Sequence, residues 1–137
     1  MSCIFCRIVA EEIPAEIVAR DERAVAFLDI TPLADGHIVV VPRAHVATVE
    51  ALSPDDAAGL FRAVHRLAGP VRSAVGAAGT TIGINDGAAT GQTIPHEHVH
   101  IVPRWASDGA GSIHTIFEHG PRRPVAEVGK AIRKALG

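Results

Sequence analysis

The sequence predicts one α+β domain with about five mostly antiparallel strands, one long helix packed on the sheet and a second helix at the C-terminus. Short segments rich in β-branched residues follow one another between turn residues, which is typical of an antiparallel meander. One longer segment spaces its apolar residues three and four apart, as the buried face of a helix does. The chain has 137 residues, and 47% of them are hydrophobic. This length is enough for one domain with a hydrophobic core and too short for two.

Five segments are expected to be strands. They are residues 17–20, 24–29, 37–41, 81–86 and 96–104. The polar turn at 21–23 joins the first two, and the turn at 34–36, which ends in a glycine, precedes the third. A helical turn is expected within residues 3–10, stopped by Pro14.

The long helix has a clear start. Ser53 is a capping residue, Pro54 suits the first helical position, and Asp55 and Asp56 place negative charge in the first turn. We expect the helix to be kinked at residues 69–70 and to end within 76–79. The apolar spacing within 125–136 predicts the C-terminal helix. We assign residues 1–105 to the core of the domain and 106–137 to a C-terminal loop and helix of the same domain.

Charge and composition exclude several classes of function. The net charge is −2 and aromatic residues are only 4%, so neither a nucleic-acid groove nor an acidic membrane surface is an expected partner. No signal-peptide pattern follows Met1, and no apolar run approaches the roughly 18 residues of a membrane span. We therefore expect the protein in the cytoplasm, with reduced cysteines.

The most informative stretch holds three histidines at alternate positions, His96, His98 and His100, directly after Pro95. On a strand they share one face, with the outer two about 13 Å apart. Three ligands of one metal must converge, so a nearly straight array is less suited to a catalytic zinc than to a central nucleophile between two orienting groups. The alternative is a solvent-facing strand that happens to be rich in histidine and has no catalytic or metal-binding role.

Two further motifs are weaker alone. Cys3-x-x-Cys6 is half of a zinc site or a redox pair, and His45 and His96 are the natural candidates to complete a Cys₂His₂ site. Spacing alone leaves zinc binding and ordinary thiols equally open. The glycine-bearing loop 85–93 either connects two strands or presents N–H groups to a phosphate just before the histidines.

Together these motifs resemble the histidine-triad (HIT) superfamily, whose signature is His-φ-His-φ-His-φ-φ with φ apolar. It stands here as residues 96–102, with Glu97 at the first φ. Because Glu97 faces away from the histidines, this departure puts sheet or interface packing in question, not the chemistry. Segments 3–8, 27–32, 36–45 and 85–93 also resemble family motifs, and the Cys-x-x-Cys resembles Hint-like bacterial members. Residues 106–137 match poorly, and the Trp-Pro-Pro-Gly of one phosphoramidase branch is absent.

The resemblance implies a nucleotide hydrolase or transferase acting at the α-phosphate, through a covalent nucleotidyl-histidine on His98. The other catalytic positions it implies are His96, His100, His37, Gln92 and Thr93, with Thr93 relaying a proton to the leaving group. It implies that Asp29 accepts from the ribose hydroxyls. The remaining nucleotide-binding positions are Phe5, Ile8, Phe27 and Ile30 around the base, and Asn85, Gly91, Gln92, Thr93, His98 and His100 near the phosphate.

The resemblance also implies one structural zinc per chain on Cys3, Cys6, His45 and His96, a purine nucleotide such as AMP as ligand, and a homodimer. Two other functions remain open. One is a nucleotide-binding interaction module with little catalysis, and the other is a metal-binding protein whose histidines all serve zinc. The leaving group, the base preference and the role of residues 106–137 with His114 and His119 do not follow from the sequence.

Overall fold

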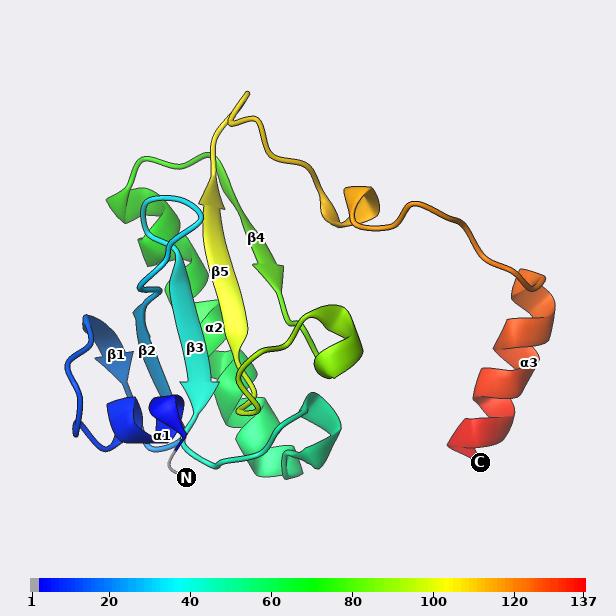
Figure 1. Ribbon diagram of the computed structural model, residues 1–137, viewed down its shortest axis with the longest axis horizontal. Helices are drawn as coiled ribbons and strands as arrows, with labels where there is room; N and C mark the ends of the chain where they lie inside the picture. The colour runs from blue at the N-terminus through cyan, green and yellow to red at the C-terminus, as the bar shows by residue number, and fades with distance from the viewer. Residues whose placement is uncertain (1–2) are drawn as a thin grey trace.

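The computed structural model describes residues 3–137 and contains one five-stranded antiparallel sheet in the order β1-β2-β3-β5-β4 (Figure 1). This confirms the expected α+β class. The strands are β1 (Ile17–Arg20), β2 (Ala24–Leu28), β3 (Ile38–Pro42), β4 (Gly79–Gly83) and β5 (Val99–Arg104). The helices are α1 (Ile4–Val9), α2 (Pro54–Ala74) and α3 (Val125–Leu136), with 3-10 turns at Val49–Ala51, Ala88–Thr90 and Ile113–Thr115.

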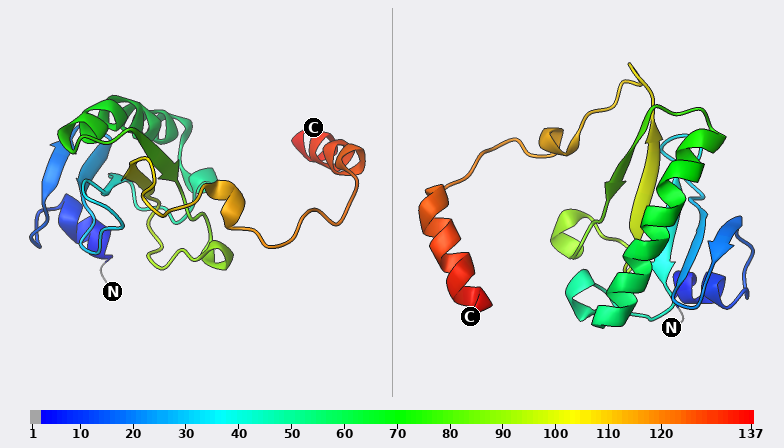
Figure 2. Two further views of the ribbon diagram at one scale, coloured as in Figure 1. Left: turned by 90° about the horizontal axis from the view of Figure 1, so that it is seen from above. Right: turned by 180° about the vertical axis from the view of Figure 1, so that it is seen from behind.

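The two faces of the sheet carry different layers. The long helix α2 covers one face (Figure 2) and packs on alternate strand residues such as Ala26, Val40 and Ile101. The opposite face carries α1, whose Phe5 and Ile8 pack on the intervening residues of β2 and β3. Because side chains alternate across a strand, one short stretch of β3 contributes to both clusters. His100 pairs with Val39 across the ladder and therefore shares the face of α1.

The start of α2 predicted from the sequence agrees with the structure. The Ser53 hydroxyl accepts the backbone N–H of Asp56, as a capping residue does. The helix continues through Pro70 and ends at Ala74, slightly before the expected 76–79. The apolar residues at helical spacing, including Leu60 and Val64, are those buried against the sheet.

Several strand boundaries differ from expectation. The third strand is Ile38–Pro42, the fourth is Gly79–Gly83, and the last begins at Val99, not at residue 96. The reason lies in the backbone bonds of 96–98: the N–H of Glu97 goes to the carbonyl of Val46, and that of His98 goes to the Glu97 side chain. Two of the three triad histidines therefore lie in the approach to β5, before its ladder begins.

Residues 106–137, called the arm below, leave the end of β5 and extend away from residues 3–105, called the body (Figures 1 and 2). The predicted helix α3 is present at the end of the arm, and its residues are exposed or only partly buried. Its membership of the same domain stays a prediction. Within residues 3–137, no helix is both long and apolar enough to cross a membrane.

Candidate functional site

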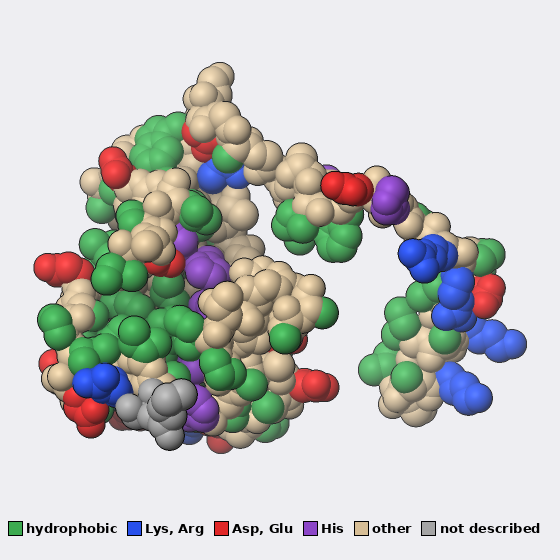
Figure 3. All heavy atoms as spheres, in the orientation of Figure 1, with side chains coloured by type: hydrophobic (Ala, Val, Ile, Leu, Met, Phe, Trp, Pro, Cys, Tyr) green, Lys and Arg blue, Asp and Glu red, His purple; other side chains and the backbone are tan. Residues whose placement is uncertain are grey.

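The histidines form a column on the face of the sheet that carries α1, next to hydrophobic surface (Figure 3). At its centre, the His98 ring contacts Phe5 edge-on at 5.1 Å and the His100 ring at 5.0 Å, measured between centroids. His98 Nδ1 lies 2.8 Å from the carbonyl oxygen of His96. A carbonyl oxygen only accepts, so Nδ1 must carry the proton. In the neutral ring, Nε2 of His98 is then the nitrogen with a free lone pair.

A second chain of bonds fixes His37 and His100. The backbone N–H of Leu33 donates to His37 Nδ1 at 3.0 Å, so His37 carries its proton on Nε2. That nitrogen lies 2.9 Å from His100 Nδ1 and donates to it. His100 in turn carries its proton on Nε2. Burial lowers the pKa of His100 to about 4, with a further contribution from His98 and His37, so His100 is a neutral donor at pH 7.

Asp29 lies beside this pair, with one carboxylate oxygen 3.5 Å from His37 Nε2. Asp29, His37 and His100 are close enough to hold a metal ion. The hydrogen bonds argue against it, however. A metal on His37 Nε2 would need the proton on Nδ1, where it would face the N–H of Leu33. The other Asp29 oxygen already accepts from the backbone and hydroxyl of Thr31.

A separate cluster, at the end of the column formed by His96, joins Cys3, Cys6, His45 and His96. The Sγ–Nδ1 distances are 3.6 Å for Cys3–His96, 3.5 Å for Cys6–His96 and 3.3 Å for Cys6–His45, and the two Nδ1 atoms are 3.2 Å apart. Zinc bonds are about 2.3 Å to sulfur and about 2.05 Å to nitrogen. In a tetrahedral site these lengths separate a sulfur from a nitrogen by about 3.6 Å and two nitrogens by about 3.4 Å. The four donors therefore fit a closed tetrahedral zinc site.

His96 connects the two sites. It is fully buried, and its Nε2–H donates to the carbonyl of Pro42 at 2.8 Å, which leaves the Nδ1 lone pair facing the cysteines. Burial lowers the pKa of His96, which keeps the ring neutral as a ligand. Its carbonyl oxygen is the acceptor that sets the tautomer of His98. The side chain of His96 thus belongs to the cluster with Cys3, Cys6 and His45, and its backbone carbonyl sets the tautomer of His98.

Comparison with known proteins identifies the family of the chain. The family model described as "HIT domain" matches residues 10–106. The chain belongs to the HIT family. A relative named adenosine 5'-monophosphoramidase hnt1, from Schizosaccharomyces pombe, is 36% identical over 104 residues, covering 76% of this chain and 75% of that protein.

Two solved structures of the HIT family bear on this chain. A HIT family member from Bacillus subtilis superposes with a TM-score of 0.88 at 32% identity, covering 100% of this chain and 99% of the other. A zinc-bound histidine triad protein from Mycobacterium smegmatis superposes with a TM-score of 0.76 at 37% identity, covering 99% and 94%. The family and the fold expected from the sequence are thereby confirmed.

The loop between β4 and β5 is braced by Gln92. The side-chain amide donates to the carbonyls of Ala47 and Ile94 and accepts the N–H of Gly87. Gly87 and Gly91 have φ angles of 100° and 96°, which only glycine adopts without strain. The side-chain amide of Gln92 therefore already bonds to backbone groups, while Thr93 and Asn85 are exposed. Their contact with a phosphate stays a prediction.

The structure brings together three of the four residues predicted to contact the base. Phe5, Ile8 and Phe27 share one buried apolar cluster beside the histidines, and the Phe5 and Phe27 rings meet edge-on at 5.5 Å. Ile30 is 96% exposed and stands outside that cluster. The contact of these residues with a base stays a prediction.

Glu97 is the residue whose role sequence reasoning missed. It is completely buried, so its charge does not disturb an exposed interface, as the departure from the family pattern had suggested. One carboxyl oxygen accepts the N–H of His98 at 2.8 Å, and the other is buried without a partner among the described residues. Burial, reinforced by Asp86, raises the pKa of Glu97 to about 7. The available signal was a charged residue at an apolar position of the signature.

Proposed function

We propose that this chain is a nucleotide hydrolase or transferase that acts at the α-phosphate through a covalent nucleotidyl-histidine on His98. The observation that carries the proposal is the bond from His98 Nδ1–H to the His96 carbonyl, which leaves Nε2 as the lone-pair nitrogen. A relative at 36% identity that is named an adenosine 5'-monophosphoramidase supports the substrate class.

The reaction has two displacements at phosphorus. In the first, Nε2 of His98 attacks the α-phosphorus of an AMP conjugate, and the bond from phosphorus to the leaving nitrogen or oxygen breaks while the leaving group takes a proton. Since Nε2 of His98 brings no proton, we assign to Thr93 the relay of a solvent proton to the leaving group. In the second, water attacks the same phosphorus, the bond to Nε2 breaks, the proton of the attacking water passes to solvent, and AMP leaves.

His100 stabilises the transferring phosphoryl group. Since its Nδ1 accepts from His37, its Nε2–H is free to donate to a phosphoryl oxygen. Because its Nδ1 lone pair is engaged by His37 and its pKa is lowered to about 4, the ring donates this hydrogen bond without taking up a proton itself. The loop N–H groups of Gln92 and Thr93 would supply further donors, and Gln92 would hold the loop in place through its amide.

The nucleoside would lie between Asp29 and the apolar cluster. One Asp29 oxygen is engaged by Thr31, so the oxygen near His37 is the one we assign to the ribose hydroxyls. Phe5, Ile8, Phe27 and Ile30 would bound a purine, and Asn85 would contact the phosphate side. AMP or an AMP conjugate is the ligand that we expect.

We also infer one structural zinc ion per chain on Cys3, Cys6, His45 and His96. When bound, the ion would fix the His96 ring and with it the carbonyl that orients His98. Thiolate ligands require reduced cysteines, and both cysteines are free thiols, which favours a reducing compartment such as the cytoplasm. As a member of the HIT family the chain is expected to be a homodimer.

The test is turnover of an adenosine phosphoramidate, with samples quenched in denaturant at alkaline pH, where a P–N bond to histidine survives, and searched by mass spectrometry for an AMP adduct on residues 96–100. We expect the adduct in the wild type, and its loss together with turnover in His98→Asn. His65→Asn, on the exposed face of α2, is the matched control and should retain both. Turnover by His98→Asn at the wild-type rate would refute the mechanism. Tight AMP binding without turnover of any conjugate would favour the interaction-module alternative.

A further inference from the structure

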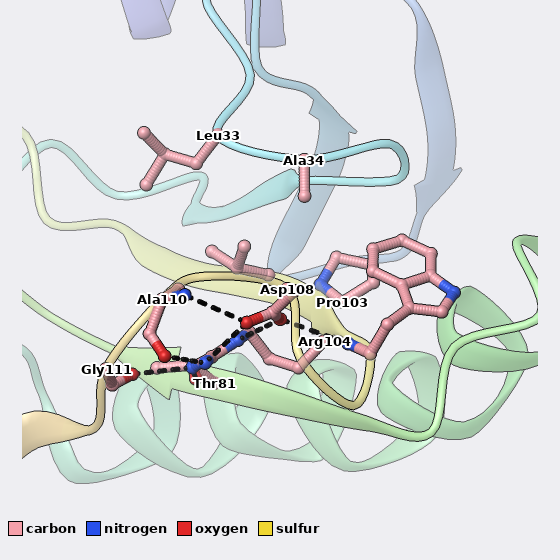
Figure 4. Close-up of a pocket in the computed structure, with 10 residues that line it drawn as sticks. Leu33, Ala34, Thr81, Pro103, Arg104, Asp108, Ala110 and Gly111 are labelled. Atoms are coloured by element: carbon pink, nitrogen blue, oxygen red, sulfur yellow. Dashed lines mark hydrogen bonds and ion pairs between the residues drawn. The ribbon is translucent and has the colours of Figure 1, made fainter.

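The arm leaves the body in a fixed direction. Arg104 uses all five guanidinium N–H donors, toward both carboxylate oxygens of Asp108, the Thr81 hydroxyl and the carbonyls of Ala110 and Gly111 (Figure 4). The indole N–H of Trp105 also donates to the carbonyl of Gly76. These bonds bind residues 105–111 to the ends of β4 and β5. The arm is therefore anchored at its root, and its extended course begins from a defined point.

Beyond residue 111 the arm exposes large apolar side chains, which a compact folded chain would normally bury. They are Ile113, Ile116, Phe117, Val125, Ile132 and Leu136. In α3 the apolar residues follow a helical stripe, with Lys130 and Lys134 on the other side. A lone helix of 12 residues is marginal in water, so α3 needs a surface to pack on.

The solvent-accessible area of the chain is larger than that of a compact monomer of the same mass. A compact monomer of 14.3 kDa exposes about 6,800 Å², whereas this chain exposes 9260 Å². The excess of roughly 2,400 Å² is several times the ~800 Å² that one partner contributes to a standard interface. The chain on its own therefore leaves enough area uncovered for a stable dimer.

Charge favours a partner with the composition of the body. Residues 121–137 contain five Arg and Lys residues and one Glu, a net charge of +4, while the body, residues 3–105, carries 8 basic and 12 acidic residues, a net charge of −4. A second copy of this chain therefore presents the sign of charge that α3 would seek.

The course of the arm indicates where that copy lies. The arm curves around an open space beside β4, and α3 faces the body across it (Figure 1). Part of this placement recurs in a solved structure. Residues 106–137 are 32 of 137, so superposing the body alone could not give a TM-score above about 0.77, yet the Bacillus subtilis protein scores 0.88. Part of the arm must therefore superpose as well, although the body does not hold it there.

The body offers a matching surface along this edge. β4 is an edge strand, and Ile82 on it is 45% exposed. Phe61 on α2 is also 45% exposed, and it lies 200° around the helix from Gly59, which faces Arg23 at the opposite side of the sheet. Phe61 and Ile82 therefore lie on the same flank of the body, next to an edge that is open to another chain.

We infer that residues 106–137 form an exchanged arm, in which α3 of each chain docks on the body of a second copy across the β4 edge. A two-fold axis beside β4 places both arms in equivalent positions and closes the assembly at two chains. The inference rests on the homodimer put forward above and assigns its contacts, while the chemistry of His98 is independent of it.

Two matched variants test the contact in the full chain. Ile132→Glu places a charge in the apolar stripe, whereas Ala131→Glu makes the same charge change about 100° away on the exposed side. Light scattering should give about twice the 14.3 kDa chain mass for the wild type and Ala131→Glu. Ile132→Glu should raise the dimer dissociation constant at least about tenfold. A monomeric wild type, or equal dissociation constants for the two variants, would overturn the inference.

Exchange is separated from folding back by cross-linking, because Lys130 and Lys134 are the only lysines of the chain. Equal amounts of ¹⁴N- and ¹⁵N-labelled protein are refolded together with zinc and treated with a carbodiimide that joins lysines to carboxylates. Exchange predicts that about half of the linked peptides from α3 to the body contain one light and one heavy partner. Links within one label only would show that the arm packs on its own body, and would refute exchange.

Phosphoramidate turnover, measured on the same samples, keeps the two proposals apart. Mixed-label links in a protein that forms no His98 adduct would count against the chemistry alone. A monomer that forms the adduct would count against the exchanged arm alone.

Discussion

The neutral state of His100 predicts a specific sensitivity of the fold to acid. Burial lowers the pKa of His100 from 6.5 to about 4, so between these values the unfolded chain binds a proton that the folded chain excludes. Stability that is fully present above pH 6.5 is therefore lost as pH falls toward 4. For one group with these two pKa values, the free energy of unfolding should fall by about 2 kcal/mol between pH 7.5 and pH 5.

The perturbation is His100→Gln, which keeps a side chain able to accept from His37 but removes the titration. Urea unfolding, followed by circular dichroism with saturating zinc, gives the free energy of unfolding at pH 7.5 and pH 5. Wild type and variant keep the same zinc ligands, and His37 and His96, whose pKa values are also lowered by burial, titrate in both. The difference between their acid sensitivities therefore isolates His100.

We expect the variant to lose about 2 kcal/mol less than the wild type over this pH range. The exposed His65→Gln serves as a control and should match the wild type. Equal acid sensitivity in wild type and His100→Gln would refute both the burial argument and the assignment of His100 as a neutral donor.

Three further changes test separate features. Cys6→Ser removes one of four zinc donors and should weaken zinc binding by more than about 100-fold in a competition titration, with His65→Gln unaffected; undiminished affinity would exclude the Cys₂His₂ site. Gly36→Ala should destabilise the chain by about 1–3 kcal/mol, because φ is +83° and a Cβ would lie 3.1 Å from Pro103, whereas Gly79→Ala, with an open environment, should cost less than about 1 kcal/mol; similar costs would contradict the strain at the turn before His37. Glu97→Gln keeps the acceptor for the His98 N–H and places a donor beside the Asp86 carboxylate, so the melting temperature should hold or rise, while Glu97→Ala should lower it; a fall in both would show that the carboxylate itself is required.

Local signals in the sequence were sufficient for most elements. The cap at Ser53 and the helical spacing after it located α2, because these interactions form within a few residues of one another. The segments 17–20 and 125–136 agree with β1 and α3 for the same reason. The last strand was placed three residues early, since alternation of side chains continues through His96 and His98 although the ladder bonds begin only at Val99.

Residue types and spacing in the sequence determined the family and the identity of the candidate nucleophile, because the histidine triad and its accompanying motifs are local patterns. Only the tertiary structure could decide which nitrogen of His98 is free, since that depends on the carbonyl of His96, and that Cys3, Cys6, His45 and His96 converge from segments more than 30 residues apart. It also decided that Glu97 is buried and that the arm leaves the body. These properties depend on distances and burial among segments far apart in the chain, which no local pattern encodes.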